Sequence, residues 1–291
     1  MRFKNSIIDL IKIRKSIRSY ESEKLKPDDI KKIIDLINKE HNTVFGFIPR
    51  FEFIDASDLD PNELKNLDTY GMITGAKYFI AGTIKNNSKN YYLVDFGYIF
   101  EKIILFITDL GLGTCWLGGT FNKKGFSEKI LLQKDEVIQG VSLVGIISRK
   151  RSLRSSVIKA FAGSKNRKPW DKLFFNGSFS SPLDGSEVGS YNKPLEMVRI
   201  APSAANLQPW RIIKEKNKNT FRFFINKSKY YLRKTGLNLQ YIDMGISLCH
   251  FELAASDLSL KGKWEVKEGI GENNKYDKPS NVDYIISWDG S

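Results

Sequence analysis

The sequence has few of the residues from which disulfide frameworks and catalytic triads are built. It contains two cysteines, Cys115 and Cys249, which form no CxxC pair and are too few for a disulfide framework. Its two histidines, His41 and His250, have no partners at catalytic spacing, so a Ser-His-Asp triad is not indicated. Cys115 is interpreted as a small buried apolar residue rather than as a nucleophile. We therefore expect a cytoplasmic protein without a metal site.

Long hydrophobic runs are also missing. The most apolar candidate, residues 99–110, is interrupted by Glu101, Lys102 and Asp109. The first 15 residues, MRFKNSIIDLIKIRK, carry Asp9 inside a short apolar run and include no small-residue cleavage site. This pattern predicts neither a membrane span nor a secretion signal, and we expect no membrane partner.

The composition is that of an ordinary globular chain, with 41% hydrophobic and 27% charged side chains among 291 residues. The formal net charge is +13. A nucleic-acid-binding protein needs a concentrated basic stripe, whereas the lysines here are scattered among Asp and Glu. The one dense basic run is SRKRSLR, residues 148–154. We interpret the charge as a solvated surface, part of which an anionic cofactor could use, and expect no nucleic-acid partner.

Hydrophobic periodicity predicts mixed helices and strands. The expected helices cover residues 6–13, 27–37, 92–110, 194–200 and 239–258, and the expected strands cover 51–54, 76–84, 137–147, 210–214 and 221–225. The two long helices resemble each other. Six residues in and after the first recur 148 positions later, without a gap: Asp95, Gly97, Asp109, Leu110, Leu112 and Trp116 become Asp243, Gly245, Asp257, Leu258, Leu260 and Trp264.

Shared leucines would follow from any two amphipathic helices, but shared Asp, Gly and Trp would not. A repeat of this length is too long for a solenoid, so it predicts a duplicated domain. We expect an α+β chain of two related halves, residues 1–165 and 166–291, that mimics a two-fold homodimer within one polypeptide.

Three segments carry the candidate chemistry, and the first is RKSIRSY, residues 14–20. Alternate positions of an extended turn project the same way, so Arg14, Ser16 and Arg18 can converge. Two guanidinium groups and a hydroxyl suit a phosphate monoester. The alternative is a solvated basic turn after a helix.

The second segment is GLGTCWLGG, residues 111–119. Its glycines allow backbone to approach a flat ligand closely, with free N–H groups pointing at it. A helix C-cap followed by a turn would explain Gly111 but not Gly118 and Gly119. The segment lacks the GK[ST] ending of a phosphate loop.

The third segment is APSAANLQPW, residues 201–210. Pro202 and Pro209 bracket a rigid loop. Ser203, Asn206 and Gln208 offer neutral donors and acceptors, suited to ribityl hydroxyls or to the polar rim of a ring. A purely structural turn would not need so many amides.

Together the three segments resemble those of the nitroreductase family of FMN-dependent oxidoreductases, with its RxSxR-type start, Gly-rich segment after the long helix and APSxxNxQPW loop. The family's members are typically homodimers with two FMN sites that draw on both subunits. The resemblance implies a nitroreductase-like fold, in which each half has a central antiparallel-rich sheet flanked by helices. It is closest to the fused, single-chain branch of TM nitroreductases.

The resemblance also implies roles for individual residues. Arg14 and Ser16 would hold the phosphate, and Lys15 would also belong to the cofactor site. Arg18 would lie near flavin N1 and the C2 carbonyl, favouring the reduced flavin. Leu117 and Gly118, with Gly119, would offer backbone N–H groups to flavin N5. Lys165 or Arg167 would complete the phosphate clamp. The ribityl chain and ring would be covered from the other half by Pro202, Ser203, Ala204, Asn206 and Gln208.

The halves have diverged unequally. In the first-half loop HNTVFGFIP, residues 41–49, Gly46 and Ile48 stand where the second half has Asn206 and Gln208. The second half carries FFNGSF, residues 174–179, in place of the arginine motif, and SLKGKWEV, residues 259–266, in place of the glycine segment. We therefore expect one FMN per chain, in a monomer that acts as a pseudo-dimer and for which further self-association stays open.

The implied activity is a two-electron ping-pong reaction. NAD(P)H would pass hydride to flavin N5, and a nitroaromatic, quinone or similar small-molecule acceptor would take it. No catalytic side chain is required, because the chemistry occurs at the flavin. Two alternatives remain: a flavin-binding protein without hydride transfer, such as a carrier, sensor or flavin-processing enzyme, and a basic nucleic-acid binder without flavin.

Overall fold

The computed structural model describes residues 3–39, 42–67, 69, 73–87, 89–148, 166–228, 238–270 and 276–291. The chain forms two compact units, Met1–Gly163 and Ser164–Ser291, each with its own sheet and helices. No helix in the described part of the chain is long and apolar enough to cross a membrane.

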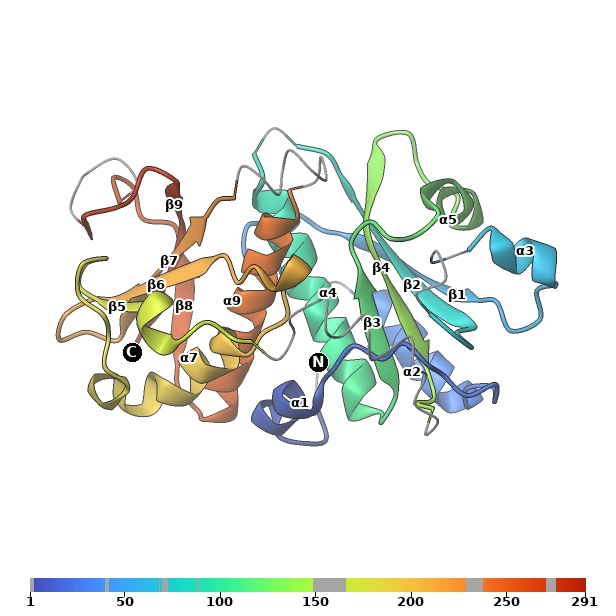
Figure 1. Ribbon diagram of the computed structural model, residues 1–291, viewed down its shortest axis with the longest axis horizontal. Coiled ribbons are helices and arrows are strands. Elements are labelled where there is room, and N and C mark those ends of the chain that lie inside the picture. Colours follow the sequence, from blue (N-terminus) through green and yellow to red (C-terminus); the bar gives the residue numbers. More distant parts are fainter. Residues whose placement is uncertain are drawn as a thin grey trace. The chain divides into compact units, whose positions relative to one another are not determined.

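The first unit contains an antiparallel sheet in the order β1-β2-β4-β3 (Figure 1). Its strands are β1 (Arg50–Asp55), β2 (Tyr78–Lys85), β3 (Gly113–Leu117) and β4 (Glu136–Gly145). Its helices are α1 (Ile7–Ile13), α2 (Pro27–Ile37), α3 (Pro61–Lys65), α4 (Tyr91–Asp109) and α5 (Lys123–Lys129).

Helix α4 lies against one face of this sheet, and α5 lies on the other side (Figure 1). The strand β2 is buried on both faces, since every residue from Tyr78 to Ile84 is buried. Successive strand residues point to opposite faces, so β2 supplies two cores. One of them contains Phe79, Phe126 and Leu143. On the other face Gly82 makes room for the ring of Phe96 from α4, which would lie within 2.8 Å of an added Cβ.

The second unit contains the sheet order β5-β6-β7-β9-β8. Its strands are β5 (Phe174–Asn176), β6 (Trp210–Lys214), β7 (Thr220–Asn226), β8 (Gly262–Glu265) and β9 (Val282–Gly290). Its α-helices are α7 (Asn192–Arg199) and α9 (Leu239–Asp257), and the short 3-10 helices are η1 (Trp170–Lys172), η2 (Gly185–Tyr191) and η3 (Ala204–Asn206).

The two sheets share one topology. Without β5, the second reads β6-β7-β9-β8, which repeats β1-β2-β4-β3, and all of these pairs are antiparallel. Both second strands carry a register shift, at Gly82/Thr83 and at Phe223/Phe224. Helices α4 and α9 each have 19 residues. The predicted α+β fold with an internal duplication is therefore confirmed.

One detail of the predicted correspondence is wrong. The Arg14–Tyr20 segment pairs with β3, where Ser16 lies opposite Thr114 in a parallel bridge. Phe174–Asn176 instead forms β5, which pairs with β6 at the edge of its sheet opposite β8. Since β8 is the counterpart of β3, the FFNGSF segment does not take the structural place of the arginine motif.

Candidate functional site

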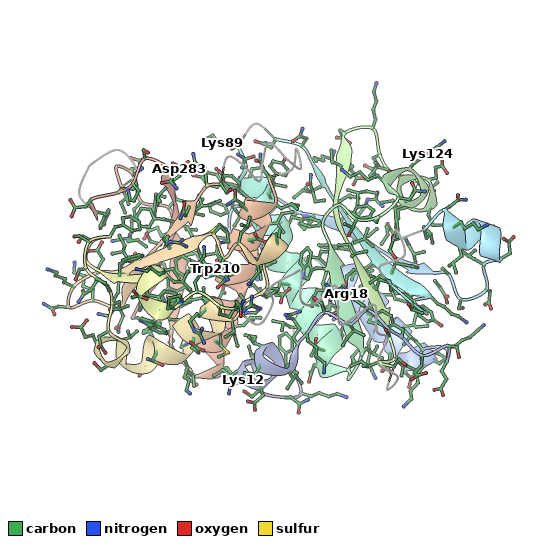
Figure 2. All side chains as sticks on the ribbon, in the orientation of Figure 1. Lys12, Arg18, Lys89, Lys124, Trp210 and Asp283 are labelled. Atoms are coloured by element: carbon green, nitrogen blue, oxygen red, sulfur yellow. The ribbon has the colours of Figure 1, made fainter. Side chains whose placement is uncertain are left out.

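The arginine motif is fixed along the edge of β3. The Ile17 N–H donates a 2.8 Å hydrogen bond to the Thr114 carbonyl, and the Thr74 N–H donates to the Arg18 carbonyl at 3.0 Å. Ile17 itself is buried. An added Cβ at Gly113 would approach the Ile17 side chain to 2.9 Å, so the first residue of β3 must be small for the motif to lie this close. Figure 2 shows Arg18 beside this strand.

The side chains of Arg14, Ser16 and Arg18 all lie near enough to Cys115 of β3 to influence its thiol. Burial raises the pKa of the Cys115 thiol, against the lowering effect of the guanidinium groups of Arg18 and Arg14 and of a hydrogen bond with the Ser16 side chain. Cys115 is 2% exposed, which fits a structural residue rather than a nucleophile. Lys15 is exposed and does not join this cluster.

Both arginines keep unused donors. The Nε atoms of Arg14 and Arg18 are buried and make no hydrogen bond. The Arg14 side chain is 8% exposed, and its Nε lies 3.7 Å from the carboxylate of Glu101. A buried cationic donor is costly when no acceptor meets it, so these arginines are candidates to hold a phosphate group.

The glycine segment leads away from the same strand. Leu117 ends β3 and is buried, whereas Gly118 is partly exposed and Gly119 is exposed. Within the described parts of the chain, the backbone N–H groups of Gly118 and Gly119 donate no hydrogen bond. They are available to an acceptor atom of a ligand.

In the second unit, the loop 201–210 adopts a backbone that few side chains tolerate. Ala205, Asn206 and Gln208 have φ values of 49°, 55° and 47°, in the left-handed region. Each such residue costs of order 1 kcal/mol, and clusters of them persist where surrounding contacts enforce them. The loop leads into β6 at Trp210, which Figure 2 marks.

The contacts that enforce this backbone come largely from residues 166–168. Arg167 donates to the Asn206 side chain and, at 2.8 Å, to the Ile200 carbonyl. The Lys168 N–H donates to the Gln208 side-chain oxygen at 2.7 Å, and the Lys168 ammonium group donates to the Leu207 carbonyl at 2.7 Å.

The predicted amides therefore shape the loop itself. Gln208 is 1% exposed, and its side-chain nitrogen donates to the Asn206 carbonyl at 3.0 Å. Its backbone N–H donates to the Ser203 hydroxyl at 2.9 Å. Pro202, Ser203 and Ala204 are each partly exposed. The sequence suggested a row of ligand-facing amides, whereas the structure shows Gln208 turned inward.

An aspartate of each long helix holds the adjoining loop. Asp95 of α4 accepts hydrogen bonds from the N–H groups of Val44, Phe45 and Phe47, at 2.7 to 3.1 Å. Asp243 of α9 accepts one, from Ala204 at 2.9 Å.

The pKa of both carboxyl groups is raised by burial, that of Asp243 most strongly, and the backbone hydrogen bonds oppose the shift. The second Asp243 oxygen is buried without a hydrogen bond. Three N–H groups of the first-unit loop thus donate to Asp95, whereas one N–H group of the second-unit loop donates to Asp243.

Four supporting residues were not predicted. Asp95 and Asp243 were visible as members of the repeat, but nothing in the pattern gave their role. Glu101 was visible as a charge inside an apolar stretch, which signals a buried partner. Lys168 had no signal beyond its place in a basic run.

Of the other predicted positions, Lys165 lies outside the described residues. In the described part of the chain, no group of three His, Cys, Asp or Glu side chains could hold a metal ion.

Known proteins resemble the chain over most of its length. Residues 6–255 match the family model described as "Putative TM nitroreductase". The crystal structure of a "putative nitroreductase" from Thermotoga maritima aligns with a TM-score of 0.60 and 18% identity, over 99% of this chain and 95% of that chain. The two chains therefore share a fold along nearly their whole lengths.

Two further solved structures match about half of the chain. An FMN-dependent nitroreductase from Clostridium difficile aligns with a TM-score of 0.41 and 18% identity, over 50% of this chain and 90% of that chain. A nitroreductase with bound FMN from Bacteroides fragilis aligns with a TM-score of 0.40 and 14% identity, over 52% and 92%. No curated protein matches the chain.

Proposed function

Because the chain belongs to the TM nitroreductase family, we propose that it is an FMN-dependent NAD(P)H oxidoreductase that reduces nitroaromatic, quinone-like or similar electron-poor small molecules. The observation that carries the proposal is the cluster of Arg14, Ser16 and Arg18 beside β3, next to a glycine segment with free N–H groups. This donor set fits a planar molecule with a phosphate tail.

The phosphate end is proposed to bind at Arg14 and Ser16. The guanidinium group of Arg14 is held in a largely buried position, and its terminal nitrogens make no hydrogen bond to a described residue. A phosphate would receive charge-assisted hydrogen bonds there and relieve the cost of burying the cation. Lys15 is exposed, so any contribution from it would be long-range attraction rather than direct contact.

The ring end is proposed to lie along Arg18 and the glycine segment. The N–H groups at Gly118 and Gly119 would meet acceptor atoms of the ring, together with the backbone at Leu117. The Arg18 side chain would place positive charge where negative charge develops on reduction. FMN, when bound, supplies the redox chemistry by accepting a hydride from NAD(P)H and passing it to the acceptor.

The second-unit loop is proposed to cover the ribityl chain and ring. Pro202, Ser203 and Ala204 are the partly exposed residues through which it would do so. Asn206 and Gln208 act by fixing the backbone, with Arg167 clamped onto the Asn206 side chain.

The test is a flavin titration followed by reduction without oxygen. The purified full-length protein, loaded with FMN, is mixed anaerobically with NADH or NADPH. The flavin absorbance should bleach with at least one of the two and return when a quinone or nitroaromatic is added. A flavin that binds but stays oxidised with both nucleotides would favour a carrier, sensor or flavin-processing protein instead. A protein that binds no flavin would contradict both functions.

A further inference from the structure

Glu101 is a fully buried carboxylate in the middle of α4, on a helix whose other buried side chains are mostly apolar. An ionised carboxylate in such a place is strongly destabilising unless cations or hydrogen-bond donors meet it. Two such partners come from the proposed flavin site. The indole Nε1 of Trp116 donates to one Glu101 oxygen at 2.7 Å, and Arg14 Nε lies 3.7 Å from the other.

These contacts join two parts of the site. Arg14 directly follows α1 and belongs to the proposed phosphate clamp. Trp116 lies on β3, one residue before Leu117 and two before Gly118. A single carboxylate on α4 therefore ties the phosphate-binding arginine to the strand that carries the glycine segment.

The second unit offers a comparison within the same chain. Trp264 is the repeat of Trp116, and its indole Nε1 also donates to a glutamate, Glu252 of α9, at 2.6 Å. Glu252 corresponds to position 104 of α4, one helical turn beyond Glu101, and the residue that matches Glu101 is Cys249. In the described part of that unit no arginine motif runs along β8.

The comparison separates two roles of the carboxylate. A glutamate at either helical position can accept a hydrogen bond from the tryptophan. The Glu101 carboxylate also lies beside Arg14, whereas no arginine motif runs along β8 in the described part of the second unit. The tryptophan hydrogen bond alone does not require a glutamate at the position of Glu101, and Arg14 is a further partner that the carboxylate meets there.

An arginine held in this way is prepared for an anion. Ordering a free arginine side chain costs conformational entropy, which a preformed rotamer avoids at the moment of binding. The carboxylate lies on the Nε side, which leaves the two terminal nitrogens for the fork-like contact that phosphate accepts.

We propose that Glu101 is a positioning residue that fixes the Arg14 guanidinium for the flavin phosphate, so that the site selects FMN over riboflavin, which lacks the phosphate. This inference rests on the proposed function, because it assumes that the site binds FMN. It adds a residue that contacts no part of the cofactor.

The experiment compares Glu101→Gln with Glu252→Gln in the full-length protein. Glutamine can still accept the tryptophan hydrogen bond in both variants but removes the charge. Dissociation constants for FMN and for riboflavin are measured by quenching of flavin fluorescence. Glu101→Gln should weaken FMN binding about tenfold or more and riboflavin binding less than about threefold. Glu252→Gln should leave both within about twofold.

A double-mutant cycle gives the second readout. In an Arg14→Gln background, Glu101→Gln should cause no further loss of FMN affinity, since the group that it positions is gone. Equal weakening of FMN and riboflavin, or additive losses in the cycle, would show that Glu101 is only structural and would overturn the inference. A wild-type protein that binds no FMN would instead refute the proposed function.

Should Glu101→Gln prevent folding, Glu101→Asp provides the same comparison. Aspartate keeps the charge but withdraws it by one methylene group from Arg14. The loss should again fall on FMN and spare riboflavin, and an equal loss for both flavins would overturn the inference.

Discussion

Lys168 is partly buried next to a second cationic side chain, that of Arg211. Its ammonium group donates to the carbonyls of Leu207 at 2.7 Å and Gln208 at 3.4 Å, and Arg211 donates to the same Gln208 carbonyl at 3.1 Å. Burial, and then the positive charge of Arg211, lower the pKa of Lys168 to about 8. In the described residues neither cation has a carboxylate partner, so the loop carbonyls are their main compensation.

This lowered pKa predicts a pH dependence of stability. The folded protein releases the Lys168 proton near pH 8, whereas the unfolded chain keeps it to about pH 10.5, the ordinary lysine value. Between these values the folded state binds fewer protons, so the Lys168 contribution to the free energy of unfolding rises with pH. Below pH 8 the full cost of the buried charge is present.

Urea unfolding of Lys168→Met and wild type from pH 7 to 10 checks this. Wild type should gain stability relative to the variant as the pH rises through 8. The control is Lys172→Met, since the Lys172 side chain is 68% exposed. A constant difference between wild type and Lys168→Met across the range would contradict the prediction.

At the scale of single residues, the sequence predicted candidate donors but not the directions of all their side chains. Arg14, Ser16 and Arg18 converge as alternate positions of an extended segment would, because β3 fixes that segment. Asn206 and Gln208 were expected to face a ligand, and Gln208 does not. Its orientation follows from three left-handed residues in one loop, a backbone that no local sequence pattern specifies.

At the scale of the elements, α4 and α9 show how one duplicated helix holds two different loops. Asp95 meets three N–H groups and Asp243 meets one. The second loop has turned its remaining N–H groups elsewhere: that of Leu207 donates to the Ala204 carbonyl at 3.1 Å. The first loop gives three of its N–H groups to Asp95, which leaves it fewer to offer a ligand.

The difference predicts unequal costs for the same substitution. Asp95→Asn puts an amide NH2 against a backbone N–H that needs an acceptor, so it should lower the free energy of unfolding by about 1–3 kcal/mol at pH 7. Asp243→Asn keeps the oxygen that accepts from Ala204 and removes a buried carboxylate, so it should cost less than about 1 kcal/mol.

The pH dependence of Asp243 has a definite sign. Because its folded pKa is raised, the folded state keeps a proton that the unfolded chain loses above pH 3.8, and stability falls as the pH rises through that window. Wild type should therefore lose stability relative to Asp243→Asn from pH 4 upward. Thermal unfolding of wild type and Asp243→Asn at several pH values measures this. At pH 7, an equal loss in the free energy of unfolding for Asp95→Asn and Asp243→Asn would contradict the unequal costs predicted above.

Element bounds were predictable to within about two residues where periodicity was strong. The long helices, expected at 92–110 and 239–258, are Tyr91–Asp109 and Leu239–Asp257. The pairing of β5 with β6 was not predictable, because a short apolar strand fits either edge of a sheet and tertiary contacts decide between them. For the same reason, the sequence did not predict that the arginine motif pairs with the edge strand β3 while, in the described residues, no corresponding segment pairs with β8.

At the scale of the whole molecule, two units of one topology carry different side chains at equivalent places. The strand β3 is followed by Gly118 and Gly119, whereas β8 is followed by Val266, which is 50% exposed. The first-unit loop has Ile48, 63% exposed, where the second has the buried Gln208. The two units keep the same arrangement of sheets and helices. They differ in the segments after β3 and β8 and in the loops before β1 and β6, which include the segments proposed to bind the cofactor.

Under the proposed function, this asymmetry predicts one FMN per chain. Titration of the wild type should saturate at one FMN. Arg18→Gln in the first unit and Asn206→Leu in the second should each weaken all of the binding, about tenfold or more, because both would act on the same bound molecule. Ile48→Ala, in the first-unit loop, should leave the affinity unchanged. Two independent sites would give a different result: the wild type would bind two FMN, and each variant would retain one of them at wild-type affinity.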